Sequence, residues 1–126
     1  MAARKKRSRA AKRGVGWPAV RKLALSFPGV TEGTSYGAHA FLLDGKFFSR
    51  FNDKEQGLVV YAADDVREAL LGGRPDAYFT TDHYRGYPYV LARLERVTKS
   101  ELAALFEQAF RARAKRKRVA EYEAKR

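Results

Sequence analysis

The sequence contains no cysteine among its 126 residues. Disulfide bonds and thiolate metal sites are therefore excluded, and stability must come from a packed core. Hydrophobic residues make up 45% of the chain, which is enough for such a core, and the length is about that of one domain. We expect one globular domain without covalent cross-links.

Long hydrophobic runs are also missing. The longest uninterrupted apolar run, Leu58 to Ala63, is far shorter than the roughly 20 residues that a membrane-spanning helix needs. The basic N-terminus is not followed by the apolar segment of a signal peptide. We expect a cytoplasmic protein without a membrane partner. An Arg-rich, acid-free N-terminus is also a property of transit peptides, so an organellar destination stays open as an alternative.

Motifs that bind nucleotide phosphates or activate a nucleophile are absent. Neither GxxxxGK[ST] nor GxGxxG occurs in the sequence. The hydroxyls of Ser35, Thr80 and Thr81 stand at no spacing that ties them to a histidine and a carboxylate. The sequence therefore gives no basis for an enzyme, and we expect a protein without catalytic residues.

Metal ligands are scarce. The two histidines, His39 and His83, fall on separate expected elements, and Glu32 and Asp82 are the acidic residues that could join them. A structural or catalytic metal needs at least three convergent protein ligands, and no third clear ligand follows from this spacing. We expect no metal ion and no cofactor, and we interpret each histidine as a hydrogen-bonded side chain at the edge of the sheet.

Positive charge is abundant, and it is concentrated at the two ends of the chain. The net charge is +12, of which residues 1–13 carry +7 and residues 111–126 carry +6, whereas residues 14–110 carry −1. Blocks of one sign often act as arms that bind nucleic acid, although they can also serve only to solvate the protein. The distribution predicts that a polyanion would contact the ends rather than the middle.

The same charge pattern divides the chain into three parts. An acid-free run such as RKKRSRAAKR cannot bury apolar area to offset its ordering entropy. We therefore expect residues 1–16 to form a disordered basic arm, residues 17–112 to form the folded domain, and residues 113–126 to form a basic helical extension.

Local patterns predict the order helix, three strands, helix, two strands, helix. Asp44-Gly45 between two apolar runs predicts a β-hairpin, and residues 31–37 are rich in turn formers. Asp65 with Glu68, and Thr98 with Glu101, have the spacing of capping boxes. The expected strands are 38–43, 46–51, 57–62, 78–84 and 89–94, and the expected helices begin at residues 17, 64 and 98. This order is typical of a two-layer α+β sandwich, with an antiparallel sheet of about five strands and helices on one face.

The stretch TDHYRGYPY, residues 81–89, has the most unusual composition in the chain. Its tyrosines and Arg85 could stack on nucleic-acid bases, because any base offers a flat face. Alternatively, Tyr84 and Tyr89 could form cross-strand contacts while Gly86 and Pro88 supply the turn. We interpret this stretch first as a corner between two strands and second as a contact surface.

Three segments follow one another along the chain: PGVTEGTSYG at 28–37, GKFF at 45–48 and TDHYRGYP at 81–88. In composition, order and spacing they resemble the MmcQ/YjbR family, and the resemblance extends over about residues 17–122. It implies a CyaY-like, double-wing α+β fold and a DNA-binding protein, and it carries no catalytic residue or cofactor over to this chain. Tyr89 stands where many relatives have Trp, and the basic N-terminal arm is not part of the family pattern.

Taken with the charge pattern, this resemblance leads us to expect a small, monomeric, non-enzymatic DNA-binding protein with weak sequence selectivity. The residues expected to contact nucleic acid are Arg4, Lys5, Lys6, Arg7, Arg9, Lys12, Arg13, Arg85, Tyr87, Arg111, Arg113, Lys115, Arg116, Lys117 and Arg118. Two alternatives remain open. One is RNA in place of DNA, and the other is a small ligand or protein partner bound between Tyr36/His39 and the Tyr84 to Tyr89 corner.

Overall fold

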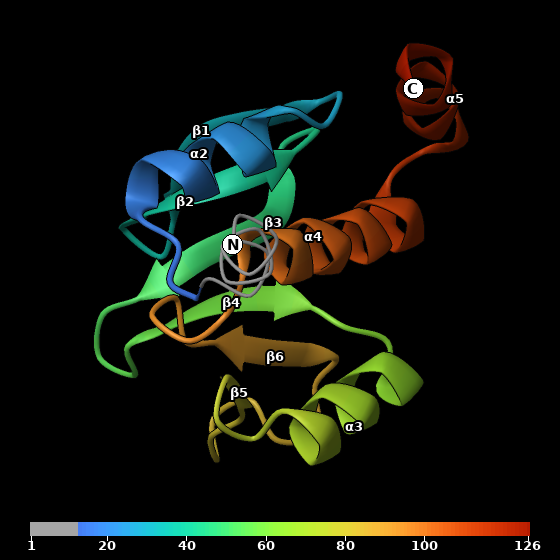
Figure 1. Cartoon of the computed structure of the whole chain (residues 1–126). Coiled ribbons are helices and arrows are strands. Elements are labelled where there is room, and N and C mark those ends of the chain that lie inside the picture. Colours follow the sequence, from blue (N-terminus) through green and yellow to red (C-terminus); the bar gives the residue numbers. More distant parts are fainter. Residues whose placement is uncertain (1–12) are drawn as a thin grey trace, which may run out of the picture.

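The computed structural model describes residues 13–126, which form one six-stranded antiparallel sheet and four helices (Figure 1). The strands are β1 (Val30–Ser35), β2 (Ala38–Leu43), β3 (Lys46–Asn52), β4 (Gly57–Tyr61), β5 (Tyr78–Phe79) and β6 (Tyr89–Ala92), in the spatial order β1-β2-β3-β4-β6-β5. The helices are α2 (Trp17–Leu25), α3 (Asp64–Gly73), α4 (Lys99–Arg113) and α5 (Arg116–Lys125). The expected α+β class is confirmed. Within residues 13–126, no helix has the length and apolar character to cross a membrane.

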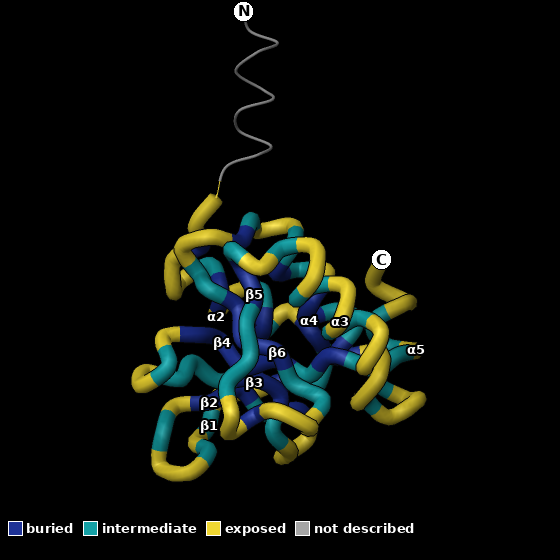
Figure 2. The backbone as a smooth tube through the Cα atoms, turned by 90° about the horizontal axis from the view of Figure 1, so that it is seen from below, coloured by how far each residue is buried: buried dark blue, intermediate teal, exposed yellow. Residues whose placement is uncertain are grey.

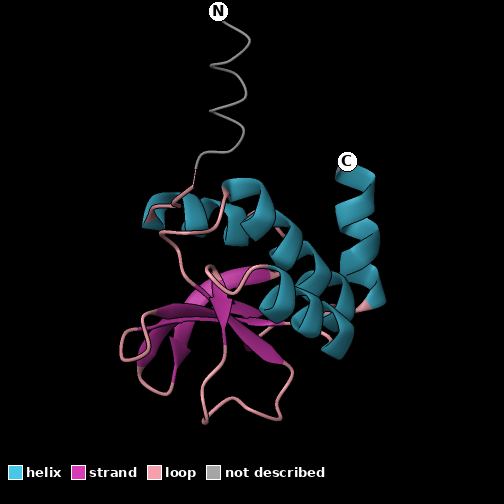
Figure 3. Ribbon diagram, turned by 60° about the horizontal axis from the view of Figure 1, so that its bottom comes forward, coloured by secondary structure: helices cyan, strands magenta, loops and turns pink. Residues whose placement is uncertain are grey.

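The helices lie on one face of the sheet, where they cover the main core (Figure 3). Strand residues that point toward them, such as Phe41, Leu58 and Val90, are fully buried against Leu102 and Phe106 of α4. Figure 2 shows these buried segments gathered along the strands and α4, with exposed backbone at the turns and outer helices. Among residues 13–126, no helix lies on the opposite face of the sheet.

Helix α4 begins with a complete capping box. The Thr98 hydroxyl accepts a hydrogen bond from the Glu101 backbone N–H at 3.1 Å, and the Glu101 carboxylate accepts one from the Thr98 N–H at 2.9 Å. This confirms the expectation for Thr98 and Glu101. The similar expectation for Asp65 and Glu68 is wrong, because α3 begins after Ala63 without a side-chain cap and Asp65 bonds only to the adjacent N–H of Val66.

Replacing Thr98 by alanine should destabilise the fold by about 1 kcal/mol, since it leaves a donor of the first turn of α4 unpaired. Urea unfolding monitored by circular dichroism measures this change. Ser100→Ala is the matched control, because the Ser100 hydroxyl contacts only the Thr98 hydroxyl, at 3.3 Å. Equal losses in the two variants would contradict the role of the cap.

The sheet contains one strand more than the sequence patterns predict. Residues 30–35 form the edge strand β1, which pairs with β2 from Val30 opposite Leu43 to Ser35 opposite Ala38. Turn-forming residues obscure this strand, because Gly33 lies within it and a side chain there would collide with Leu42. The predicted strand 78–84 is shorter than expected, since β5 ends at Phe79 and the following residues form a loop.

The basic C-terminal segment is a helix of its own. The chain breaks at Ala114, and α5 lies beyond the end of α4 (Figure 1). The ring of Tyr122 packs against Phe27 and Phe110, with ring centroids 5.3 Å away in both cases. This helix is therefore attached to the core by an aromatic contact.

Candidate functional site

The loop between β5 and β6 covers the face of the sheet that the helices leave open. Val59 and Leu91 point to this face and are almost fully buried, together with Tyr84 of the loop. Tyr84 is only 8% exposed, whereas Tyr87 is 59% exposed. The TDHYRGYPY stretch is thus anchored by Tyr84 and presents Tyr87 to solvent.

Polar contacts hold this loop in place. The Tyr84 hydroxyl accepts hydrogen bonds from Arg50 Nη2 at 3.4 Å and from Asn52 Nδ2 at 3.3 Å. From α3, the Arg67 guanidinium donates to the Tyr87 carbonyl, and this side chain is 16% exposed. Strand β3 and helix α3 therefore both fix the position of the loop.

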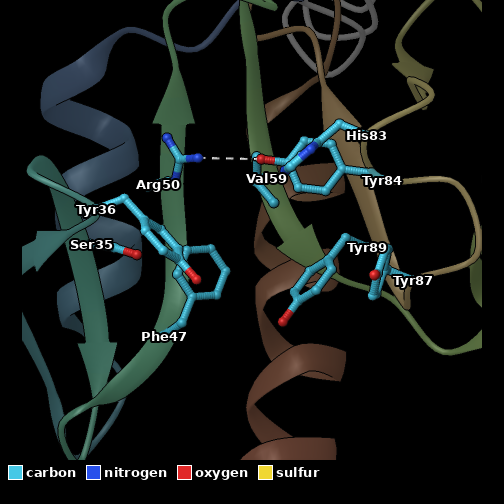
Figure 4. Close-up of a pocket in the computed structure, with 9 residues that line it drawn as sticks. All are labelled: Ser35, Tyr36, Phe47, Arg50, Val59, His83, Tyr84, Tyr87 and Tyr89. Carbon is cyan, nitrogen blue, oxygen red and sulfur yellow. Dashed lines mark hydrogen bonds between the residues drawn. The ribbon is translucent and has the colours of Figure 1, made fainter.

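A pocket of about 620 Å³ lies between this loop and the turn that joins β1 to β2 (Figure 4). Its lining residues are Ser35, Tyr36, Phe47, Arg50, Val59, His83, Tyr84, Tyr87 and Tyr89. Figure 4 shows Tyr36 and Phe47 on one side, Tyr89 and Tyr87 on the other, and Arg50 and His83 at one end. The volume lies within the range of small-ligand pockets.

A bulge in β3 places Arg50 in this pocket. Phe41 of β2 pairs with Ser49, but the next residue, Leu42, pairs with Phe47, so β3 contains one extra residue. Because of this extra residue, Phe47 and Arg50 reach the same face although they are three positions apart. The sequence pattern indicates neither residue as part of this pocket, since simple alternation would place them on opposite faces.

The turn between β1 and β2 holds an exposed tyrosine in an unfavourable conformation. Tyr36 has a φ of 52° and is 98% exposed, and it precedes Gly37 with a φ of 79°. A two-residue turn of this type favours Asn-Gly or Asp-Gly, and a left-handed non-glycine residue costs about 1 kcal/mol. The turn therefore places an aromatic ring at the pocket at the expense of stability.

His39 and Glu32 lie on the other face of the sheet. His39 Nε2 is 3.3 Å from Glu32 Oε2, and its ring packs edge-on against Trp17. Arg21 donates to the Glu32 carboxylate at 2.7 Å and lowers its pKa. The structure thus brings Tyr36 to the Tyr84 to Tyr89 corner, but His39 does not join them. Within residues 13–126, no cluster of three or more metal-ligating side chains occurs.

Most of the predicted N-terminal contacts, from Arg4 to Lys12, lie outside the described residues. Arg13 lies 3.6 Å from Asp76, and Arg85 lies 2.9 Å from Asp82. Both ion pairs are well exposed, so both arginines remain accessible. Their contact with nucleic acid stays a prediction.

The C-terminal cations differ in their surroundings. Arg111 pairs with Glu107 and Glu123, and Arg113 lies over the Tyr61 ring, 4.9 Å from its centroid. Arg118 donates to Asp44 at 2.7 Å, and it also pairs with Glu121. Arg111 and Arg118 thus attach α5 to the rest of the domain.

Three adjacent cations, Lys115, Arg116 and Lys117, form what we call the basic cluster. All three are exposed, and none forms an ion pair in the part of the chain that the structure describes, although the charges of Lys115 and Lys117 contribute to the lowered pKa of Asp44. They begin α5, whose first turn contains no acidic residue. Cations at this end oppose the helix dipole, so the cluster does not stabilise the helix that carries it.

The contact between α5 and the β2–β3 turn is expected to weaken in acid. The hydrogen bond from Arg118 lowers the pKa of Asp44. A carboxyl whose pKa is lowered by folding contributes stability above its unfolded pKa, which is lost as the pH falls through the folded value. We expect the free energy of unfolding of the parent to exceed that of Asp44→Asn at neutral pH, and the difference to shrink below about pH 4. Urea unfolding of both proteins between pH 7 and pH 2 measures it, and a difference independent of pH would contradict the pairing.

The comparisons with known proteins point to one family. The family model YjbR matches residues 25–112. Over 45 residues, the chain is 42% identical to uncharacterized proteins of Mycobacterium bovis and of two strains of Mycobacterium tuberculosis. This segment covers 36% of the chain and 35% of each relative, so the match spans about a third of the relatives' length. No solved structure matches the chain.

Proposed function

Since the chain belongs to the YjbR family, we propose that it is a small, non-enzymatic DNA-binding protein that contacts mainly the phosphate backbone. The proposal agrees with the DNA-binding role that the family resemblance implies. It places the contact at the two cationic ends of the chain.

The observation that carries this proposal is the basic cluster. Ion pairs within the fold neutralise Arg111 and Arg118, but the three cations of the cluster are exposed and form no ion pair among the described residues. Phosphate groups would supply the missing negative charge, and the +7 of residues 1–13 adds to the same attraction.

Contacts of this kind bind DNA without reading its sequence. Lysine and arginine at phosphates release condensed counterions, so the affinity falls as the salt concentration rises. Phosphate contacts position a protein on the duplex but carry no direct sequence information. We therefore expect weak sequence selectivity and steep salt dependence.

A fluorescence-anisotropy titration of the full chain tests the proposal. The probes are a labelled DNA duplex, a single strand of the same length and the matching RNA, each at several salt concentrations. Binding of the duplex with a steep salt dependence supports the proposal, tighter binding of RNA would favour the RNA alternative, and binding of none of them would refute it.

A further inference from the structure

We propose that the open-face pocket binds a single nucleotide unit, with its base between the tyrosines and its phosphate at Arg50. The open-face pocket is the cavity on the helix-free face of the sheet, whose walls are Tyr36, Phe47, Tyr87 and Tyr89 around Val59. The proposal concerns a site separate from the basic cluster, and it stands whether or not the cationic ends bind DNA.

The walls of the pocket suit a flat ring. Phe47 and Tyr89 meet edge to face across the pocket, with centroids 5.8 Å apart, and Tyr36 lies next to Phe47 while Tyr87 lies next to Tyr89 (Figure 4). The rings of Tyr36 and Tyr87 are free to stack, because Tyr36 is 98% and Tyr87 is 59% exposed. Nucleic-acid bases stack on such aromatic faces without regard to base identity.

Arg50 gives the pocket its charge preference. This side chain belongs to a half-buried residue, and its hydrogen bond in the fold is a long one of 3.4 Å to the Tyr84 hydroxyl. None of the described residues that line the pocket is acidic. A partly buried cation without a counter-charge is costly, so an anionic group at this end of the pocket would be stabilised.

The conformation of Tyr36 supports a binding role for the pocket. Its left-handed backbone would be easier for asparagine or glycine, and its exposed ring contributes little to the core. Strain that the fold does not need is often found where a side chain has a binding role. At the opposite wall, the hydrogen bond from Arg67 fixes the backbone of Tyr87.

The experiment uses isothermal titration calorimetry of the full chain with adenosine 5′-monophosphate and with adenosine. We expect the monophosphate to bind about tenfold more tightly than adenosine, since one charge-assisted contact is worth about a factor of ten. Arg50→Gln should remove this difference. Tyr36→Asn should weaken both ligands about tenfold and leave the melting temperature unchanged or higher.

A matched control separates the ring of Tyr36 from its backbone conformation. Gln56 also has a positive φ, 59°, but it does not line the pocket. Gln56→Asn should therefore change the melting temperature in the same direction as Tyr36→Asn without changing nucleotide affinity.

A second arm identifies the source of the nucleotide. A five-nucleotide adenine DNA strand is compared with an abasic strand of the same length, which carries the same phosphates. The cationic ends would bind the two strands equally, so a preference for the adenine strand that Tyr36→Asn abolishes reports on the pocket alone.

If the monophosphate binds, and if Tyr36→Asn and Arg50→Gln weaken its binding as expected, the ligand of the pocket is a free nucleotide. If the monophosphate does not bind but the adenine strand binds more tightly than the abasic strand, the ligand of the pocket is an unpaired nucleotide of DNA. The proposal is overturned if neither probe shows a base-dependent interaction up to millimolar concentrations, or if the interaction is unaffected by both Tyr36→Asn and Arg50→Gln.

Discussion

Replacing the basic cluster, Lys115, Arg116 and Lys117, by glutamine is expected to flatten the salt dependence of DNA binding. If each cation neutralises one phosphate, the logarithmic salt slope changes by about 0.9 for each contact that is lost. The factor by which affinity falls between 50 and 200 mM salt should then be roughly 40-fold smaller than in the parent protein. Anisotropy titrations on one duplex at several salt concentrations measure both slopes.

The control for this variant removes the same charge elsewhere. Lys22, Lys54 and Lys99 are exposed and have no ion-pair partner among the described residues, so their replacement by glutamine matches the change in net charge. Equal effects of the two triple variants would show that only total charge matters, which contradicts a defined contact. Substitution is preferable to truncation here, because truncation would also remove Tyr122 from its place against Phe27.

The second large effect is expected at Tyr84. Replacing it by alanine removes a buried ring from above Val59 and Leu91, and we expect a loss of about 3 kcal/mol in the free energy of unfolding. The covering of the open face depends on this ring, so the pocket should be lost as well. Urea unfolding measures the loss of stability.

Two further variants show which part of the loop is structural. Tyr84→Phe should cost less than about 1 kcal/mol, because the hydrogen bonds to its hydroxyl are long, 3.3 and 3.4 Å. Tyr87→Ala should stay within about 0.5 kcal/mol of the parent, since the ring is exposed. Similar losses for Tyr87→Ala and Tyr84→Ala would contradict the division of the loop into an anchor and an exposed surface.

Local patterns were enough to predict most of the fold. Asp44-Gly45 identified the β2–β3 hairpin, since a turn with two positive φ angles needs such residues. The capping box at Thr98 identified the start of α4. The edge strand β1 escaped prediction because Gly33 and the Tyr36-Gly37 turn disguise it.

The candidate pocket could be predicted only in part. The tyrosines of residues 81–89 were recognisable from composition, and Tyr36 was named with them as one side of a ligand site. Arg50 was not recognisable as a pocket residue, because a bulge in β3 decides which face it reaches. No local signal in the sequence specifies that bulge. His39 was grouped with Tyr36 because the two are close in sequence, yet they lie on opposite faces of the sheet.

Charge counting also has a limit that the structure makes clear. The sequence assigns the same role to every cation between residues 111 and 118. The structure separates Arg111 and Arg118, which pair with acidic residues of the fold, from the basic cluster, which does not. Only tertiary contacts, such as that between Arg118 and Asp44, make this distinction.

The most direct test of the proposed function is to map the backbone amide signals of the full, isotope-labelled chain by nuclear magnetic resonance during titration with a short DNA duplex. We predict that the largest shifts occur at residues 113–117 and in residues 1–13, with smaller changes over the rest of the domain. Shifts centred elsewhere, for example on α3, or no shifts at all, would contradict it.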